Sequence, residues 1–216
     1  MVARDILLAE LTGARFHVAH ISSRYSVEMV RFAKARGLAV TSEATPHHFV
    51  LSDSGMPPYD SNYKMKPPLR SGCDVGAVLQ GIVWGAVDAI ATDHAPHPGS
   101  EKMQEFEKCP FGILGLETAV GIALEQLVHT GKISLARMVE LFTTGPASVL
   151  NLNRGSLSVG APADLTIFGT EHSWTYDVNK SASKSRNSPF HGSTFHGGPV
   201  ATIVNGQVVW TFGGNI

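Results

Sequence analysis

Residues 91–97, which read Ala-Thr-Asp-His-Ala-Pro-His, form the densest group of side chains suited to chemistry, and they follow a short apolar run. Such a run predicts a buried parallel strand, and the residues after such a strand open onto the active-site face of α/β enzymes. At that position the carboxylate of Asp93 can ligate a metal or act as a general base, with His97 just beyond it. The alternative interpretation is an aspartate that only caps a turn.

His17 and His20 form a second group, in the run Phe-His-Val-Ala-His-Ile of residues 16–21. Residues three apart on a strand point to opposite faces, so we expect that these two histidines do not share one metal. His20 lies at the carboxyl end of the predicted strand and is the candidate metal ligand, although a structural role is the alternative. His17 is interpreted as a packed histidine.

Two predicted loops add histidines and cations. His47 and His48 follow the next predicted strand, where adjacent histidines either bind metal or fill a loop. Lys64, Lys66 and Arg70 stand in a segment stiffened by two prolines, and this group suits an anionic substrate. A solvated basic loop explains the same three residues equally well.

The elements that position these residues follow from the hydrophobic pattern. Helices are expected over residues 2–12, 74–84, 114–129 and 135–144 and between Ser23 or Ser26 and Gly37, and strands over residues 15–22, 38–42 and 87–92. This alternation is typical of parallel α/β architecture. From residue 155 the chain becomes glycine-rich and β-like, and Asn205-Gly206 between two β-branched runs predicts a type I′ hairpin.

The length of the chain limits this architecture. A closed (β/α)8 barrel takes about 200 to 250 residues, whereas the α/β pattern here ends near residue 150 and has room for about three strands. The predicted fold class is therefore α/β, with a partial TIM (β/α)8 barrel over residues 1–150. A small C-terminal β-rich module is expected over residues 151–216.

Composition excludes several classes of function. The chain has 216 residues, 43% of them apolar, and a formal net charge of -1, so it lacks the basic footprint of a nucleic-acid-binding protein. Two cysteines are too few for a disulfide framework and no apolar run reaches the length of a membrane span, so a cytoplasmic setting is expected. The expected partners are a small-molecule substrate and other protein chains, with no nucleic acid and no membrane.

Seven stretches, taken in order, resemble the bacterial type I dihydroorotases of the amidohydrolase superfamily. They are residues 16–22, 41–48, 64–70, 91–97, 110–113, 181–192 and 202–209. Residues 93–97 (Asp-His-Ala-Pro-His) and 183–190 (Ser-Lys-Ser-Arg-Asn-Ser-Pro-Phe) are the specific ones, since hydantoinases and allantoinases usually carry a different pair after the corresponding Asp-His. The resemblance covers essentially the whole chain and corresponds to the C-terminal half of the family's proteins.

This resemblance implies a binuclear zinc site at a barrel mouth, where a metal-bridging hydroxide attacks the ring amide of dihydroorotate. The reverse reaction closes N-carbamoyl-L-aspartate, a step of de novo pyrimidine biosynthesis. By position, His20 corresponds to a zinc ligand, and Asp93 to the residue that touches metal and transfers the proton. Lys66, His97 and the backbone around Phe111 and Gly112 correspond to substrate-binding positions.

Two departures from the family pattern matter. The family's loop usually reads Lys-Met-Asn-Pro-Pro-Leu-Arg, whereas Lys66 replaces the Asn here, and an ammonium cannot accept a hydrogen bond as an amide oxygen does. The His-x-His pair, the bridging ligand, a further histidine and the groups that hold the substrate carboxylate correspond to positions before this region. His20 and Asp93 are the ligands that can be placed, so the zinc site is expected to be incomplete.

Three interpretations remain open from the sequence. The chain is a dihydroorotase, present as a fragment, with a misassigned start, or as one piece of a split enzyme with a complementing N-terminal half. Alternatively, it is a catalytically silent dihydroorotase-like scaffold that pairs with itself as a homo-oligomer or with aspartate transcarbamoylase. The third interpretation is a cyclic amidase of the hydantoinase or allantoinase type.

Overall fold

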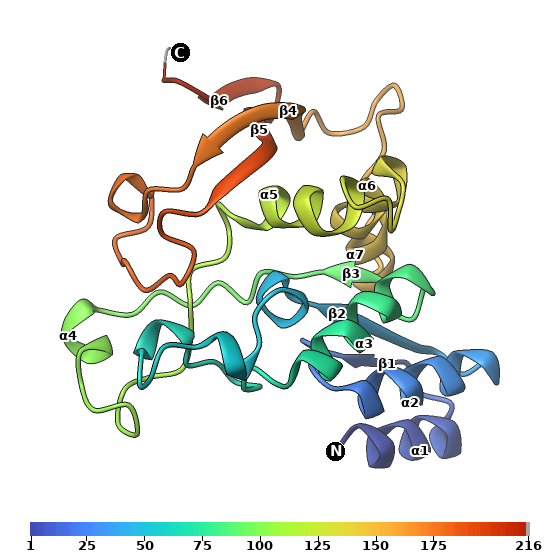
Figure 1. Ribbon diagram of the computed structural model, residues 1–216. Coiled ribbons are helices and arrows are strands. Elements are labelled where there is room, and N and C mark those ends of the chain that lie inside the picture. The colour runs from blue at the N-terminus through green and yellow to red at the C-terminus, as the bar shows by residue number, and fades with distance from the viewer. Residues whose placement is uncertain (215–216) are drawn as a thin grey trace. The chain divides into compact units, whose positions relative to one another are not determined.

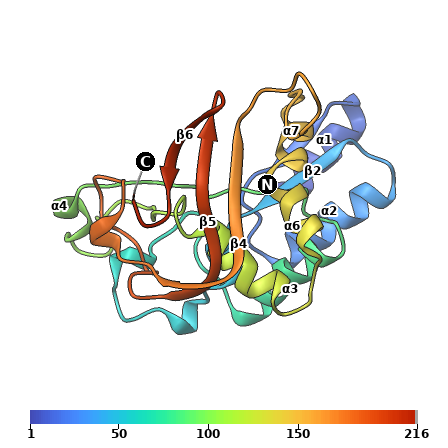
Figure 2. The ribbon, with the colours of Figure 1, turned by 90° about the horizontal axis from the view of Figure 1, so that it is seen from above.

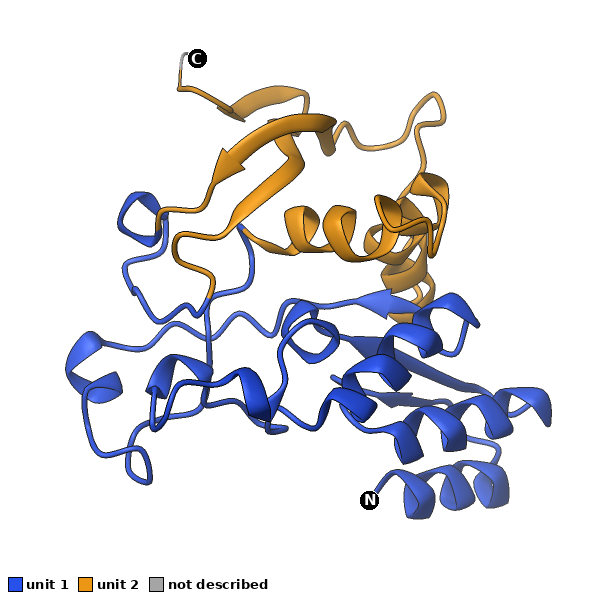
Figure 3. Ribbon diagram, viewed as in Figure 1, with its two compact units in different colours: residues 1–117, 178–189 blue, residues 118–177, 190–216 orange. Residues whose placement is uncertain are grey.

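The computed structural model describes residues 1–214 and divides them between two units (Figure 1, Figure 3). Unit 1 comprises residues 1–117 and 178–189, and unit 2 comprises residues 118–177 and 190 onward. The expected division near residue 150 followed the change in composition. Packing divides the chain differently, because the helices of residues 119–149 group with the later strands.

The sheet of unit 1 has three parallel strands in the order β1-β2-β3 (Figure 1). They are β1 (Phe16–Val18), β2 (Val40–Ala44) and β3 (Ala89–Ile90). In register, Phe16 lies opposite Val40 and Glu43 lies opposite Ala89. The two outer strands share one sheet, which confirms the predicted parallel α/β arrangement. Strands β1 and β3 are shorter than their apolar runs, whereas β2 has the expected length but begins two residues later than expected.

Three helices alternate with these strands in sequence, namely α1 (Val2–Thr12), α2 (Arg24–Ala35) and α3 (Gly72–Val83). Helix α1 packs against β1, and α2 packs against α1, α3 and β2. The hydroxyl of Ser23 accepts a hydrogen bond from the Ser26 N–H at the start of α2, which confirms the predicted serine cap. Gly13 ends α1 with a φ of 70°, as expected of a C-cap glycine. The core residues Val30, Ala33, Val78 and Ile82 are fully buried.

Two long connections follow β2 and β3. The first, residues 45–71, contains the short 3-10 helices η1 (Pro46–Phe49), η2 (Asp53–Gly55) and η3 (Ser61–Tyr63). The second, residues 91–117, contains α4 (Gly99–Lys102). A separate segment, residues 178–189, belongs to unit 1 and begins with η5 (Val178–Lys180). Most of the predicted site residues lie on the two connections.

Unit 2 combines a helical part with an antiparallel sheet. Its helices are α5 (Ala119–Ala123), the π-helix η4 (Leu124–Val128), α6 (Leu135–Phe142) and α7 (Thr144–Val149). Its strands are β4 (Leu165–Thr175), β5 (Thr194–Val204) and β6 (Gln207–Thr211), and Figure 2 shows β5 in the middle. Asn205 and Gly206 have φ values of 50° and 78°, which confirms the predicted hairpin turn.

Within residues 1–214 no helix is both long and apolar enough to cross a bilayer.

Candidate active site

His20 and Asp93 follow the carboxyl ends of the two outer strands of the unit 1 sheet. His20 stands two residues after β1 and Asp93 three residues after β3, so both lie beyond the same edge of the parallel sheet. Their φ values are 36° and 47°, in the left-handed region that non-glycine residues rarely adopt. Such backbone strain costs about 1 to 3 kcal/mol per residue and is concentrated at functional sites.

Glu43, on the central strand β2, links the residues of this edge. One carboxylate oxygen lies 3.2 Å from His17 Nε2, and the other accepts a hydrogen bond of 3.3 Å from the backbone N–H of His20. Because β1 ends at Val18, the alternation of side chains along a strand does not extend to His20. Glu43 therefore contacts the ring of His17 and the main chain of His20. That the two histidine side chains do not share one metal stays a prediction.

The charges at this edge influence one another. Burial raises the pKa of the Asp93 carboxyl, while His20 acts to lower that pKa and Glu43 acts to raise it. The hydrogen bond from His17 lowers the pKa of Glu43, against the effect of burial. A carboxyl whose pKa is raised toward neutrality is better suited to accept and return a proton. Asp93 has this property and Glu43 does not.

The arrangement supplies an incomplete set of metal ligands. His20 Nδ1 is buried and has no hydrogen-bond partner among the described residues, as expected of an imidazole nitrogen that coordinates a metal. Within residues 1–214, however, no three His, Cys, Asp or Glu side chains converge closely enough to hold a metal ion. Residues 1–214 therefore do not form a complete metal centre by themselves.

The adjacent histidines of η1 are both buried, and His48 has a structural role. Its Nδ1 lies 2.7 Å from the Thr45 hydroxyl and its Nε2 lies 3.0 Å from the carbonyl oxygen of Pro67. Since a carbonyl can only accept, Nε2 carries the proton and Nδ1 accepts from Thr45. Burial lowers the pKa of His48 to about 4 and lowers that of His47 well below its usual value. His48 is thus neutral, and both ring nitrogens are engaged.

The four predicted substrate-binding residues lie together. Lys66 Nζ is 5.8 Å from the ring centre of Phe111, and Phe111 is about half exposed. The backbone of Gly112 approaches His97 and Ala95 so closely that a Cβ built on Gly112 would lie 3.1 Å from His97 Nε2 and 2.5 Å from Ala95 Cβ. Lys66, His97, Phe111 and Gly112 come from three separate stretches of the sequence and form one cluster, which we call the substrate-binding cluster.

Two buried lysines anchor the loop that carries this cluster, and sequence reasoning missed that role. Lys64 Nζ donates to the carbonyl oxygens of Phe106 (2.5 Å), Glu107 (3.1 Å) and Cys109 (2.6 Å). Lys102 Nζ donates to those of Pro110 (3.0 Å) and Gly112 (3.1 Å). The interpretation of Lys64 as a cation for an anionic substrate is therefore wrong, because its ammonium is buried and satisfied by backbone oxygens.

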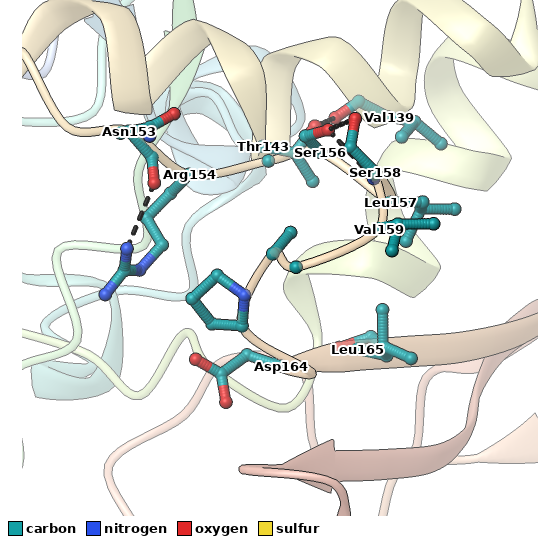
Figure 4. A pocket seen from close by; sticks show the side chains of 15 residues that line it. Val139, Thr143, Asn153, Arg154, Ser156, Leu157, Ser158, Val159, Asp164 and Leu165 are labelled. Atoms are coloured by element: carbon teal, nitrogen blue, oxygen red, sulfur yellow. Dashed lines mark hydrogen bonds between the residues drawn. The ribbon is translucent and has the colours of Figure 1, made fainter.

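Unit 2 contains a surface hollow of about 610 Å³ between α6 and residues 153–166 (Figure 4). Its polar groups are engaged locally. Arg154 Nη1 donates to the Asn153 carbonyl (3.0 Å), and Asp164 accepts from the Asn205 N–H (2.9 Å). None of the predicted site residues lines this hollow, so the candidate chemistry belongs to unit 1.

Comparison with known proteins gives a consistent result. Residues 10–209 match the amidohydrolase family. The chain is 66% identical over 211 residues to a protein named dihydroorotase from Solibacter usitatus, and 51% identical over 209 residues to one from Pelotomaculum thermopropionicum. These matches cover 98% and 97% of this chain but 49% of each relative. The chain therefore spans about half the length of the curated relatives it matches.

Solved structures of similar proteins include hydantoinases. The D-hydantoinase of Thermus sp. has a TM-score of 0.90 and 26% identity, and the L-hydantoinase of Arthrobacter aurescens has a TM-score of 0.90 and 30% identity. Each match covers 100% of this chain and 49% of the other. The chain thus shares a mixed α/β fold with these hydantoinases, and its higher sequence identity is to proteins named dihydroorotase.

Proposed function

Because this chain belongs to the amidohydrolase family, we propose that it supplies the C-terminal half of a dihydroorotase. That enzyme converts dihydroorotate and N-carbamoyl-L-aspartate into one another in cytoplasmic pyrimidine biosynthesis. The observation that carries the proposal is the pairing of His20 with Asp93 beyond one edge of the parallel sheet, with the Asp93 pKa raised by burial. The 66% identity to a relative of that name supports the same substrate.

The fold supports a matching proposal for architecture. We propose that β1, β2 and β3 are the last three strands of a (β/α)8 barrel, since they are parallel, adjacent and joined through α2 and α3. The chain spans 49% of relatives such as that of Solibacter usitatus, which leaves room for the remaining strands in the other half. Residues 151–216 would then form most of the β-rich module.

The amidohydrolase family implies a metal cofactor, and we propose zinc. His20 and Asp93 would be the ligands that this chain contributes, and the unpartnered Nδ1 of His20 supports that assignment. A catalytic zinc site takes three protein ligands and an open position. The described residues do not supply such a set, so the other ligands would come from a complementing N-terminal half.

This chain's own residues would move the proton and bind the substrate. Asp93 would accept and return a proton at its carboxylate, which its raised pKa favours. The exposed ammonium of Lys66 and the ring of Phe111 would contact the substrate, as would His97, which lies close to Gly112. The backbone N–H of Gly112 donates to the Lys64 carbonyl, and its carbonyl accepts from Lys102 Nζ. Gly112 would therefore contribute to the cluster through its missing side chain, which leaves space beside His97.

The alternative with structural support is a cyclic amidase of the hydantoinase type, because solved hydantoinases share the fold with a TM-score of 0.90. Their identity to this chain is 26% to 30%, well below that of the proteins named dihydroorotase. A silent scaffold is the remaining alternative, and the incomplete set of metal ligands among residues 1–214 favours it.

The test is complementation. The chain would be produced together with the N-terminal half of the Solibacter usitatus relative, supplied with zinc, and assayed with dihydroorotate, hydantoin and allantoin. We expect dihydroorotate hydrolysis, and a loss of at least about a hundredfold in Asp93→Asn, because proton transfer by a positioned side chain contributes about that much. The matched control is Asp53→Asn, at an exposed aspartate. Preference for hydantoin would favour the sibling amidase, and inactivity with all three substrates would favour the scaffold.

A further inference from the structure

Asn187 lies on the segment that belongs to unit 1 although unit 2 precedes and follows it in sequence. Its side chain is 3% exposed and uses every hydrogen-bonding group it has. Nδ2 donates to the carbonyl oxygens of Ala95 (2.9 Å) and Gly112 (3.0 Å), and Oδ1 accepts from the His97 N–H (3.2 Å). A buried amide that is fully satisfied in this way is rigidly held.

These bonds join the two arms of one loop. Residues 95–97 follow β3, and residues 112–114 form the later arm, which ends shortly before unit 2 begins in sequence. The arms also meet where the Ala95 N–H donates to the Ile113 carbonyl (2.9 Å). The backbone of Asn187 accepts a further bond from the Leu114 N–H (2.9 Å). Asn187 therefore contacts both arms at once, through its side chain and through its main chain.

The chemistry of the site requires an amide. Two carbonyl oxygens and one N–H converge on the side chain, so the residue must offer two donors and one acceptor within a short reach. An aspartate of the same size keeps the acceptor for His97 but places a carboxylate oxygen against two carbonyl oxygens. An alanine removes all three bonds and leaves the carbonyls of Ala95 and Gly112 with fewer partners.

We propose that Asn187 is a positioning residue, which fixes His97 against Gly112 and so sets the geometry of the substrate-binding cluster. The description of that cluster as substrate-binding rests on the proposed function. The fixing of the two arms rests on the hydrogen bonds alone. The two parts are therefore tested by separate measurements.

The first measurement is hydrogen exchange, followed residue by residue by NMR on the 216-residue chain. In Asn187→Ala and Asn187→Asp we expect the N–H groups of Ala95 and Gly112 to exchange at least about tenfold faster, because each variant removes both donors from the junction. Ile21 and Ala91, whose N–H groups bond within the sheet region, should be unchanged. The matched control is Asn153→Ala, at an exposed asparagine of unit 2.

Two results would overturn the proposal. Exchange at Ala95 and Gly112 that matches the unsubstituted chain in both variants would show that Asn187 does not hold the arms. Exchange that accelerates equally throughout unit 1 would show a general contribution to folding in place of local positioning. Neither result depends on catalysis, so neither can be confused with failure of the proposed function.

The second measurement separates KM from kcat in the complemented enzyme. Since Asn187 contacts the arms and its side chain bonds to neither His20 nor Asp93, we expect Asn187→Asp to raise KM for dihydroorotate about tenfold or more and to change kcat less. Asn153→Ala should leave both constants unchanged. A fall in kcat of about tenfold or more with KM unchanged would contradict a role in the binding cluster.

Discussion

Lys66 is an exposed residue for which we predict an effect on substrate binding. Its ammonium lies 5.8 Å from the centre of the Phe111 ring, and it can donate hydrogen bonds but not accept them. In the complemented enzyme we expect Lys66→Asn to lower KM for dihydroorotate by about fivefold, the value of one added neutral hydrogen bond. Steady-state kinetics would measure this, with the exposed Lys132→Asn as control. An unchanged or higher KM would show that Lys66 is accommodated or useful.

At this scale the sequence predicted the places of the candidate residues after the strands better than it predicted their neighbours. Asp93 and His20 were recognised by their places after apolar runs, and the structure brings both beyond the same sheet edge. Their roles as ligands and proton carrier stay predictions. Glu43 was missed because a single carboxylate in a strand gives no signal until the partner strands place His17 and His20 against it. The contacts of Asn187 were missed for a similar reason, since the partners of its side chain lie 75 to 92 residues away in sequence.

His48 connects two elements, because it belongs to η1 and donates to the Pro67 carbonyl in the following loop. Its pKa falls from 6.5 to about 4 on folding. Between these two pH values the unfolded chain binds a proton at His48 and the folded chain does not. Stability is therefore lost as pH falls from about 6.5 toward 4. We expect a loss of about 2 kcal/mol between about pH 7 and about pH 5 from this residue.

Urea unfolding at several pH values would measure this loss. In His48→Gln, which cannot titrate, the free energy of unfolding should fall less steeply over the same range. His191→Gln, at an exposed histidine, should retain the steep dependence. A pH profile for His48→Gln that coincides with that of the unsubstituted chain would assign the acid sensitivity to other groups.

The elements themselves were largely predictable. Gly13, Ser23 and the Asn205-Gly206 pair have local roles that a short stretch of sequence can reveal, and each was found where it was expected. Strands β1 and β3 are shorter than their apolar runs, because side chains that pack beneath loops are as apolar as those in a sheet. The division into units could not be predicted, since it depends on α5 packing against β5 more than seventy residues later.

At the scale of the whole molecule, the chain lacks a complete set of ligands among its described residues. We therefore expect the 216-residue chain alone to bind zinc weakly and to show no measurable dihydroorotase activity. A zinc ion with too few protein ligands would be bound weakly and would not be held in a position suited to the reaction. Fewer contacts to the substrate would lower the activity further. Equilibrium dialysis with zinc and an assay with and without the N-terminal half would test this. Activity of the chain alone would refute it, whereas activity only on mixing would support a split enzyme.

The return of residues 178–189 to unit 1 has a consequence for synthesis on the ribosome. The strands of the parallel sheet lie within the first ninety residues, whereas Asn187 is added 90 residues after His97. At about 5 to 20 residues per second, the loop would wait about 5 to 20 seconds for its partner. During that interval the carbonyls of Ala95 and Gly112 lack the amide that later holds them. The nascent chain thus contains all three sheet strands before it contains the residue that fixes the geometry of its binding cluster.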